Sequence, residues 1–298
     1  MKKALMLAAS LLTGVAADAG LFSVQVETAT RTACTGDAVS YSLFIPQPAD
    51  GLPPPPWPAV VLSHGFARTK KAHADNAFFM AQRGLVVLTP DQVGLGGAGV
   101  REKNIAVTLD HLEWLRSRSD TPDDPLEGLV DWYRMGLAGH SAGGALSFEA
   151  AARSQSAGFP VSAVFLLDAV PWRSTLEAAS TLMPLPLGSL RSEPASCNAE
   201  GAVRELLREL SFPVDDLLLV GATHCDPENP TDALCRWFCG GSTALMRSLY
   251  RRLMLLFFQD AFDMPPVELV FIDYESTLAW LEGLGLIARE ALPGAPFQ

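Results

Sequence analysis

The sequence predicts one α/β domain in which helices cover both faces of a mostly parallel sheet. Hydrophobic residues make up 49% of the 298 residues and charged residues 18%, which excludes a disordered or collagen-like chain. Short, unbroken apolar runs alternate with helical patterns, as they do in sheets that are buried on both faces. No repeat period and no linker indicates a second domain, so we expect residues 20–298 to form a single one.

Strands are predicted where an apolar run is too short for a helix, and helices where apolar side chains recur at helical spacing. The predicted strands are Val39 to Ile45, Ala59 to Leu62, Leu85 to Leu88, Met135 to Ala138, Val161 to Leu167 and Leu217 to Val220. The predicted helices are Ala74 to Gln82, Ile105 to Arg118, a helix from about Ala142, Val203 to Leu210 and Ala244 to Phe258. The tail, about Asp273 to Leu286, is predicted to be one more helix and a loop.

The N-terminus has the three-part pattern of a secretory signal peptide. Lys2 and Lys3 precede an apolar stretch, and Ala17-Asp18-Ala19 is a small-x-small cleavage site, so residues 1–19 are set aside. The apolar stretch is too short for a membrane span, and we expect no integral membrane segment. A net charge of −11 leaves no basic footprint for a nucleic acid. The protein is therefore expected to be secreted or periplasmic, and monomeric.

The five cysteines are Cys34, Cys197, Cys225, Cys235 and Cys239. Export implies an oxidising compartment, so we expect one or two disulfides with at least one thiol left over. A zinc site is the competing interpretation, but the sequence has no C-x-x-C pair and only His224 nearby. We therefore expect no metal ion.

The strongest chemical signal is Gly139-His140-Ser141-Ala142-Gly143, a G-x-S-x-G sequence between a predicted strand and a predicted helix. A nucleophile elbow needs such a strand-to-helix turn, with glycines to relieve crowding. A serine hydroxyl also needs a base to take its proton. Ser141 is therefore the candidate nucleophile.

The chain order nucleophile, acid, histidine selects the partners of Ser141. His224 is the only histidine after Ser141, and it lies in a loop that leaves a predicted strand. Asp168 ends the predicted strand Val161 to Leu167, which would bring its carboxylate to the catalytic edge of the sheet. Asp215 and Asp216 precede the later strand, so they are expected at the opposite edge.

The oxyanion hole needs two backbone N–H groups directed at the developing charge. Ala142 follows the nucleophile, and Phe66 lies in the loop Ser63-His64-Gly65-Phe66 after an earlier strand, so these two N–H groups are the candidates. His64 is interpreted as part of the loop architecture. Phe66 and Trp172 are candidate walls of the substrate pocket, although large aromatic residues are as often buried in the core.

A glycine-rich stretch, Gly94-Leu95-Gly96-Gly97-Ala98-Gly99, fits the pattern G-x-G-x-x-G of dinucleotide sites. Such a site needs the first glycine at the end of a strand and an acidic residue at the tip of the next. Thr89 to Val93 intervene here, and Asp110 falls within a predicted helix. We interpret the stretch as a flexible loop near the rim of the active site, and we expect no cofactor.

Together these motifs resemble the α/β-hydrolase superfamily, above all its secreted ester hydrolases of the polyester-hydrolase (cutinase-like), chlorophyllase and platelet-activating-factor acetylhydrolase types. The resemblance spans about residues 35–260 and is carried by Ser63 to Phe66, Gly139 to Gly144, Leu166 to Pro171 and Gly221 to His224. It implies a catalytic core of about eight strands, a triad of Ser141, Asp168 and His224, and no cofactor. The segment Trp172 to Glu200 and the cysteine-rich segment after His224 match no single subfamily.

The sequence thus predicts a secreted serine hydrolase that cleaves carboxylic esters through an acyl-enzyme. Its substrate is expected to be a small-molecule, lipid or polymeric ester. Two alternatives stay open: a lipid or phospholipid acyl hydrolase, and an inactive binding protein on the same fold.

Overall fold

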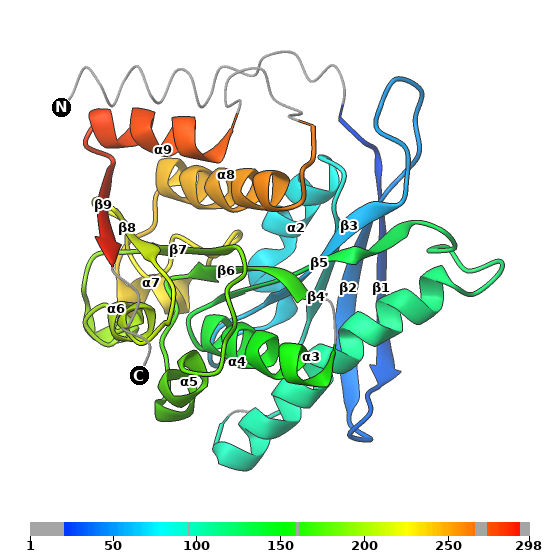
Figure 1. The fold of residues 1–298 in the computed structure, drawn as a ribbon, viewed down its shortest axis with the longest axis horizontal. Coiled ribbons are helices and arrows are strands. Elements are labelled where there is room, and N and C mark those ends of the chain that lie inside the picture. Colours follow the sequence, from blue (N-terminus) through cyan, green and yellow to red (C-terminus); the bar gives the residue numbers. More distant parts are fainter. Residues whose placement is uncertain (1–20, 95, 159–160, 266–272, 293–298) are drawn as a thin grey trace.

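The computed structural model describes residues 21–94, 96–158, 161–265 and 273–292. The expected signal peptide, residues 1–19, lies outside them. The described residues form one sheet with the order β1-β2-β4-β3-β5-β6-β7-β8-β9 (Figure 1). Its strands are β1 (Val24–Thr32), β2 (Ala38–Pro46), β3 (Trp57–Ser63), β4 (Val86–Pro90), β5 (Val130–His140), β6 (Val161–Leu167), β7 (Leu187–Arg191), β8 (Val214–Leu219) and β9 (Ile287–Leu292).

The sheet is parallel in its centre and antiparallel at its two edges. β4, β3, β5, β6, β7 and β8 run parallel to one another. β2 pairs antiparallel with β4, β1 with β2, and β9 with β8. The carboxyl ends of the central strands therefore meet at one edge, where open α/β sheets place their ligand sites.

Helices cover both faces, as the sequence predicts. The helices are α2 (Ala74–Ala81), α3 (Ala98–Ser119), α4 (Ala142–Ala157), α5 (Arg173–Ala179), α6 (Val203–Arg208), α7 (Ala233–Cys239), α8 (Ala244–Ala261) and α9 (Tyr274–Gly283), with short 3-10 helices η1 (Lys70–His73) and η2 (Ser196–Asn198). α2, α8 and α9 share a buried cluster on one face, and α3, α4, α5 and α6 share another on the opposite face (Figure 1). No helix in the described ranges is both long and apolar enough to cross a bilayer.

Every strand and helix that the sequence predicts is present, but three strands were not predicted. β1 and β9 are edge strands, and β7 is a short strand in the parallel part of the sheet. The tail prediction was incomplete, because β9 follows α9 and extends the sheet beyond β8. The prediction for Asp215 and Asp216 was also wrong in detail, since β8 starts at Val214 and contains both residues.

Candidate active site

Ser141 lies at the tight turn between β5 and α4. Its φ of 56° is in the left-handed region that non-glycine residues rarely adopt. A Cβ on Gly139 would lie 2.2 Å from the Gly143 carbonyl oxygen, and one on Gly143 would lie 2.4 Å from the His64 carbonyl oxygen. Neither clash can be relieved by a side-chain movement, so both glycines are required for a turn this tight. The local sequence thus produces a strained elbow of the kind that exposes a nucleophile.

Ser141, His224 and Asp168 form a hydrogen-bonded chain. The Ser141 hydroxyl lies 3.0 Å from His224 Nε2, and His224 Nδ1 lies 2.6 Å from Asp168 Oδ2. Because a carboxylate accepts at Nδ1, that nitrogen carries the imidazole proton and Nε2 is left to accept from the hydroxyl. All three residues are buried. This arrangement can deprotonate Ser141 during attack on a carbonyl carbon.

Asp168 lies directly after β6, with its carboxylate fully buried. Oδ1 accepts the Ser192 N–H at 3.0 Å, and Oδ2 accepts the Ser192 hydroxyl at 2.5 Å. The Asn198 side-chain N–H group lies 3.2 Å from Oδ2. These donors, from the end of β7 and from η2, stabilise the charged carboxylate and fix its orientation toward His224. Sequence analysis did not identify Ser192 or Asn198, because β7, whose end positions Ser192, was not predicted.

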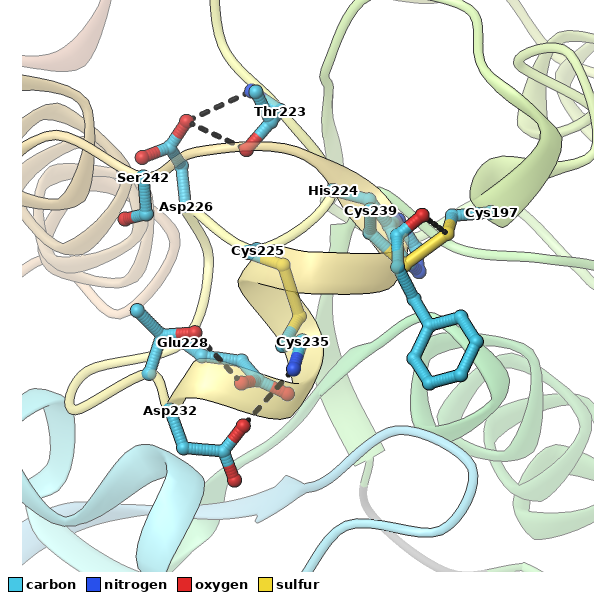
Figure 2. Close-up of a disulfide and its surroundings, with 12 residues drawn as sticks. Cys197, Thr223, His224, Cys225, Asp226, Glu228, Asp232, Cys235, Cys239 and Ser242 are labelled. Carbon is cyan, nitrogen blue, oxygen red and sulfur yellow. Dashed lines mark hydrogen bonds between the residues drawn. A yellow bond between two sulfur atoms is a disulfide. The ribbon is translucent and has the colours of Figure 1, made fainter.

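The segment after His224 is cross-linked by two disulfides. Cys225, the residue after His224, is bonded to Cys235 of α7, and Cys197 is bonded to Cys239 at the end of α7 (Figure 2). The number of bridges agrees with the sequence prediction, and Cys34 is the free thiol left over. The sulfur atoms of Cys225, Cys235 and Cys239 lie within 4.8 Å of one another. Because all three are oxidised, none is the thiolate that a zinc site requires.

Two acidic side chains of this segment accept hydrogen bonds from the backbone. Asp226 Oδ2 accepts the Thr223 N–H at 2.7 Å (Figure 2), and Asp226 Oδ1 accepts the Thr243 N–H at 2.9 Å. Asp232 caps α7, because its carboxylate accepts the Cys235 N–H at 3.0 Å. Asp226 thereby connects the turn that carries His224 to the start of α8.

An ion pair between the partly buried Arg68 and the buried Glu228 joins this segment to the loop after β3. Arg68 donates to both Glu228 oxygens, at 2.7 and 2.8 Å, and its Nη2 lies 2.9 Å from Asp232. Burial raises the pKa of the Glu228 carboxyl, and the hydrogen bonds from Arg68 oppose that rise. The loop that carries Phe66 and the segment that carries His224 are thus held to each other.

The His140 ring packs against the ring of His224, with 4.6 Å between their centroids. Burial lowers the pKa of the His140 imidazole well below its usual value, so the ring is neutral at physiological pH. His140 therefore supports His224 without placing a second positive charge beside it.

The two candidate oxyanion donors and the two candidate wall residues line one pocket. Its volume is about 350 Å³, and Phe66, Ala142 and Trp172 are all among its lining residues. The Phe66 side chain is 63% exposed, so it is not a core residue. The adjoining Gly65 packs directly on the elbow, since a Cβ there would lie 3.2 Å from Ser141 Cβ. Their parts in binding and in an oxyanion hole remain predictions.

The glycine-rich stretch and His64 lie at the same pocket. Gly94, Gly96 and Gly97 line it, in agreement with a loop at the rim, whereas Ala98 and Gly99 already belong to α3. His64 Nε2 accepts the Gln92 N–H at 3.0 Å, and the Gln92 side chain donates back to the His64 carbonyl oxygen. His64 therefore fixes two loops together, which is the architectural role that the sequence analysis gave it.

The sheet, the elbow and the hydrogen-bonded chain define an α/β-hydrolase. A family model supports this class: the chlorophyllase family matches residues 14–189, more than half of the chain. The chain therefore belongs to the chlorophyllase family of the α/β-hydrolase superfamily, a family of ester hydrolases. The matched range contains Ser141 and Asp168 and ends before His224. No curated protein matches the chain.

Proposed function

We propose that the protein is a secreted serine hydrolase that cleaves carboxylic esters through an acyl-enzyme. His224 takes the Ser141 proton during attack, and Asp168 holds the imidazole in the tautomer that this step needs. The N–H groups of Phe66 and Ala142 stabilise the tetrahedral oxyanion. His224 then protonates the leaving alcohol, and water releases the acyl group from Ser141.

One observation carries this proposal: the continuous chain from the Ser141 hydroxyl through His224 to Asp168, with distances of 3.0 and 2.6 Å. The family supports the same chemistry, because it indicates ester hydrolysis. The strained φ of Ser141 adds support, since such strain persists where the surrounding structure enforces it.

Labelling by a fluorophosphonate probe tests the nucleophile. The wild-type protein is expected to be labelled and Ser141→Ala to lose both labelling and ester turnover while remaining folded. Ser180→Ala, which changes an exposed serine at the end of α5, is the matched control and should keep both. Labelling that persists in Ser141→Ala would place the nucleophile elsewhere, and a wild-type protein that is never labelled would favour a binding protein.

A lipid acyl hydrolase is the second candidate, and exposed apolar side chains favour it. Leu234, Trp237 and Phe238 of α7 are 55–78% exposed, close to the His224 segment. Turnover that rises sharply when a long-chain ester passes its solubility limit would select this candidate. Faster hydrolysis of short, soluble esters than of long-chain esters would favour a general esterase. Chlorophyll should be tested beside these esters because of the family's name.

Export is part of the proposal, and the two disulfides are compatible with an oxidising compartment. Mass spectrometry of the exported protein should give an N-terminus near Gly20. Intact residues 1–19 on that protein would contradict signal-peptide cleavage.

A further inference from the structure

The pocket beside Ser141 combines aromatic walls with a cationic side chain whose ion-pair partner lies beyond hydrogen-bond distance. Phe66 and Trp172 form part of its wall, and Arg101 from the first turns of α3 reaches it beside them. The Arg101 guanidinium lies over the Trp172 ring, 5.5 Å from its centroid. A pocket of about 350 Å³ is large enough for a short acyl chain with a polar end.

Other polar side chains of this pocket are already engaged. Asn104 exchanges hydrogen bonds with the backbone of Val93, and Arg68 is paired with Glu228 and Asp232. Gln92 donates to the backbone of His64. Asn104 and Gln92 carry no charge, and the charge of Arg68 is already paired. None of the three can therefore attract a charged ligand.

Arg101 differs from them. Its Nε lies 3.6 Å from a Glu149 oxygen, beyond hydrogen-bond distance, and is buried without a hydrogen-bond partner among the described residues. The other Glu149 oxygen accepts hydrogen bonds from Ser174 and Thr175. Glu149 is thus held by α5 through one oxygen and faces Arg101 Nε with the other. The remaining N–H groups of the planar guanidinium are the donors that a carboxylate ligand would use.

The positions of the candidate catalytic groups indicate which half of the ester enters this pocket. Ala142 and Phe66, the candidate oxyanion donors, line it, whereas His224 is not among its lining residues. The leaving alcohol must lie beside His224, because that residue gives it a proton. The acyl half therefore occupies the pocket, on the side of the carbonyl carbon away from His224.

We propose that the protein prefers half-esters of short dicarboxylic acids, whose free carboxylate binds Arg101. This inference rests on the proposed function, and it names the substrate class of the same site. The N-terminus of α3 lies at this end of the pocket, where the positive end of the helix dipole favours an anion, and no acidic residue in the first turn opposes it. The overall charge of −11 repels anions, so the selectivity has to come from this local contact.

The test compares two matched series of ethyl esters in a pH-stat. The ethyl half-esters of succinic, glutaric and adipic acid are paired with ethyl butyrate, pentanoate and hexanoate, which have the same acyl lengths. The measured quantity is the ratio of kcat/KM for each charged ester to kcat/KM for its neutral partner. At the preferred length we expect this ratio to be roughly tenfold in favour of the carboxylate.

Variants at two arginines assign the effect. Arg101→Met should reduce the ratio to below one, and Arg101→Lys should keep part of it, because a point charge remains without the planar fork. Arg153→Met is the matched control: Arg153 is half-exposed on α4 and pairs with Glu102, so this variant should keep the wild-type ratio.

Two results would overturn the inference alone: neutral esters turned over with no preference for any half-ester, or an equal loss on both series in Arg101→Met. The second result would mean that Arg101 only supports Glu149 and Trp172. If neither series is hydrolysed and no fluorophosphonate label is taken up, the proposed function fails, and this inference fails with it.

Discussion

Two regions of the molecule hold the candidate triad in different ways. Ser141 and Asp168 lie at the ends of neighbouring parallel strands, and the backbone ladder continues past both of them. The Ser141 N–H donates to the Leu167 carbonyl oxygen at 3.0 Å, and the Asp168 N–H donates to the Leu190 carbonyl oxygen at 2.9 Å. His224 lies beyond the end of β8, at Leu219, in a turn without such a ladder.

This difference shows which interactions hold a catalytic residue in place where the backbone hydrogen bonds of the sheet do not reach it. A short turn outside the sheet loses much conformational entropy when it is fixed in one geometry. Disulfides, carboxylate caps and the ion pair between Arg68 and Glu228 connect this turn to α7, α8 and the loop after β3. The sheet therefore fixes two members of the candidate triad, and local cross-links fix the third.

The largest expected effect is on the strand side. Asp168→Asn should lower kcat by about four orders of magnitude, because the imidazole loses the partner that fixes its tautomer. Asp216 is the matched control: it is also buried, but its carboxylate accepts from Arg191 at 2.7 Å rather than from His224. Asp216→Asn should lower the melting temperature and leave kcat nearly unchanged. Steady-state kinetics and thermal unfolding of both variants check this, and the reverse pattern would move the acid to β8.

The next effect is on the side of His224. Removing the bridge from Cys225 to Cys235 by Cys225→Ser with Cys235→Ser should lower kcat about ten- to a hundredfold, because a displacement of His224 by ~1 Å is enough for such a loss. By loop-closure entropy this bridge contributes about 3 kcal/mol to stability, and the longer one from Cys197 to Cys239 about 4 kcal/mol. We thus expect the first bridge to matter more for kcat and the second more for the free energy of unfolding.

Cys34→Ser is the control for these disulfide variants, because Cys34 is an exposed free thiol. It should change neither kinetics nor unfolding. If the variant without the bridge from Cys225 to Cys235 kept the wild-type kcat, the cross-links would serve stability alone, and the contrast between the two regions would fail for catalysis.

The sequence predicts the centre of the sheet well and its edges poorly, for a physical reason. Strands buried on both faces are continuous apolar runs, whereas β1 exposes most of its side chains and β9 half of them, and neither shows such a run. β7 was missed because Gly188 interrupts it. A Cβ at Gly188 would lie 2.5 Å from the Phe165 ring, so packing requires glycine at this position of β7. In the sequence, a glycine within a short apolar stretch is more typical of a loop than of a strand.

The candidate site divides in the same way. Ser141, Asp168 and His224 could be named from a local motif, a strand end and their order in the chain. Ser192, Asn198 and Arg101 could not, because their contacts join elements far apart in the sequence. The disulfide pairing depends on the same tertiary arrangement, and spacing alone leaves several pairings open.

A smaller effect is expected from the ion pair that joins the two regions. Glu228→Gln leaves the largely buried Arg68 with Asp232 as its remaining carboxylate partner, and should lower the free energy of unfolding by about 3 kcal/mol. The loss of kcat should be only a few-fold, because the disulfides still hold His224. Urea unfolding of Glu228→Gln, Arg68→Met and the double variant checks this. A double variant as unstable as the sum of the two single ones would show that the pair is not coupled.

The smallest expected effect distinguishes the two faces by pH. Burial lowers the pKa of His73, near the His224 segment, to about 3, and that of His111, in α3 on the other face, also to about 3. An unfolded histidine has a pKa near 6.5, so between about pH 6 and pH 4 the unfolded chain binds protons that the folded chain does not. Stability from these groups is therefore fully present above pH 6.5 and is lost as the pH falls, by up to about 1.4 kcal/mol per pH unit for each histidine.

His111→Gln should reduce the pH dependence of the free energy of unfolding by the contribution of about one proton. Any change in absolute stability does not affect this slope, and the carboxylates that titrate in the same range are unchanged. Urea unfolding at intervals between pH 6.5 and pH 4 gives the slope for both proteins. The Nδ1 of His111 lies 2.8 Å from the Arg31 guanidinium, which further disfavours the charged ring, so the full difference should appear at this position. An unchanged slope in His111→Gln would mean that His111 binds its proton equally in the folded and unfolded chains, and that the face carrying α3 admits water at low pH.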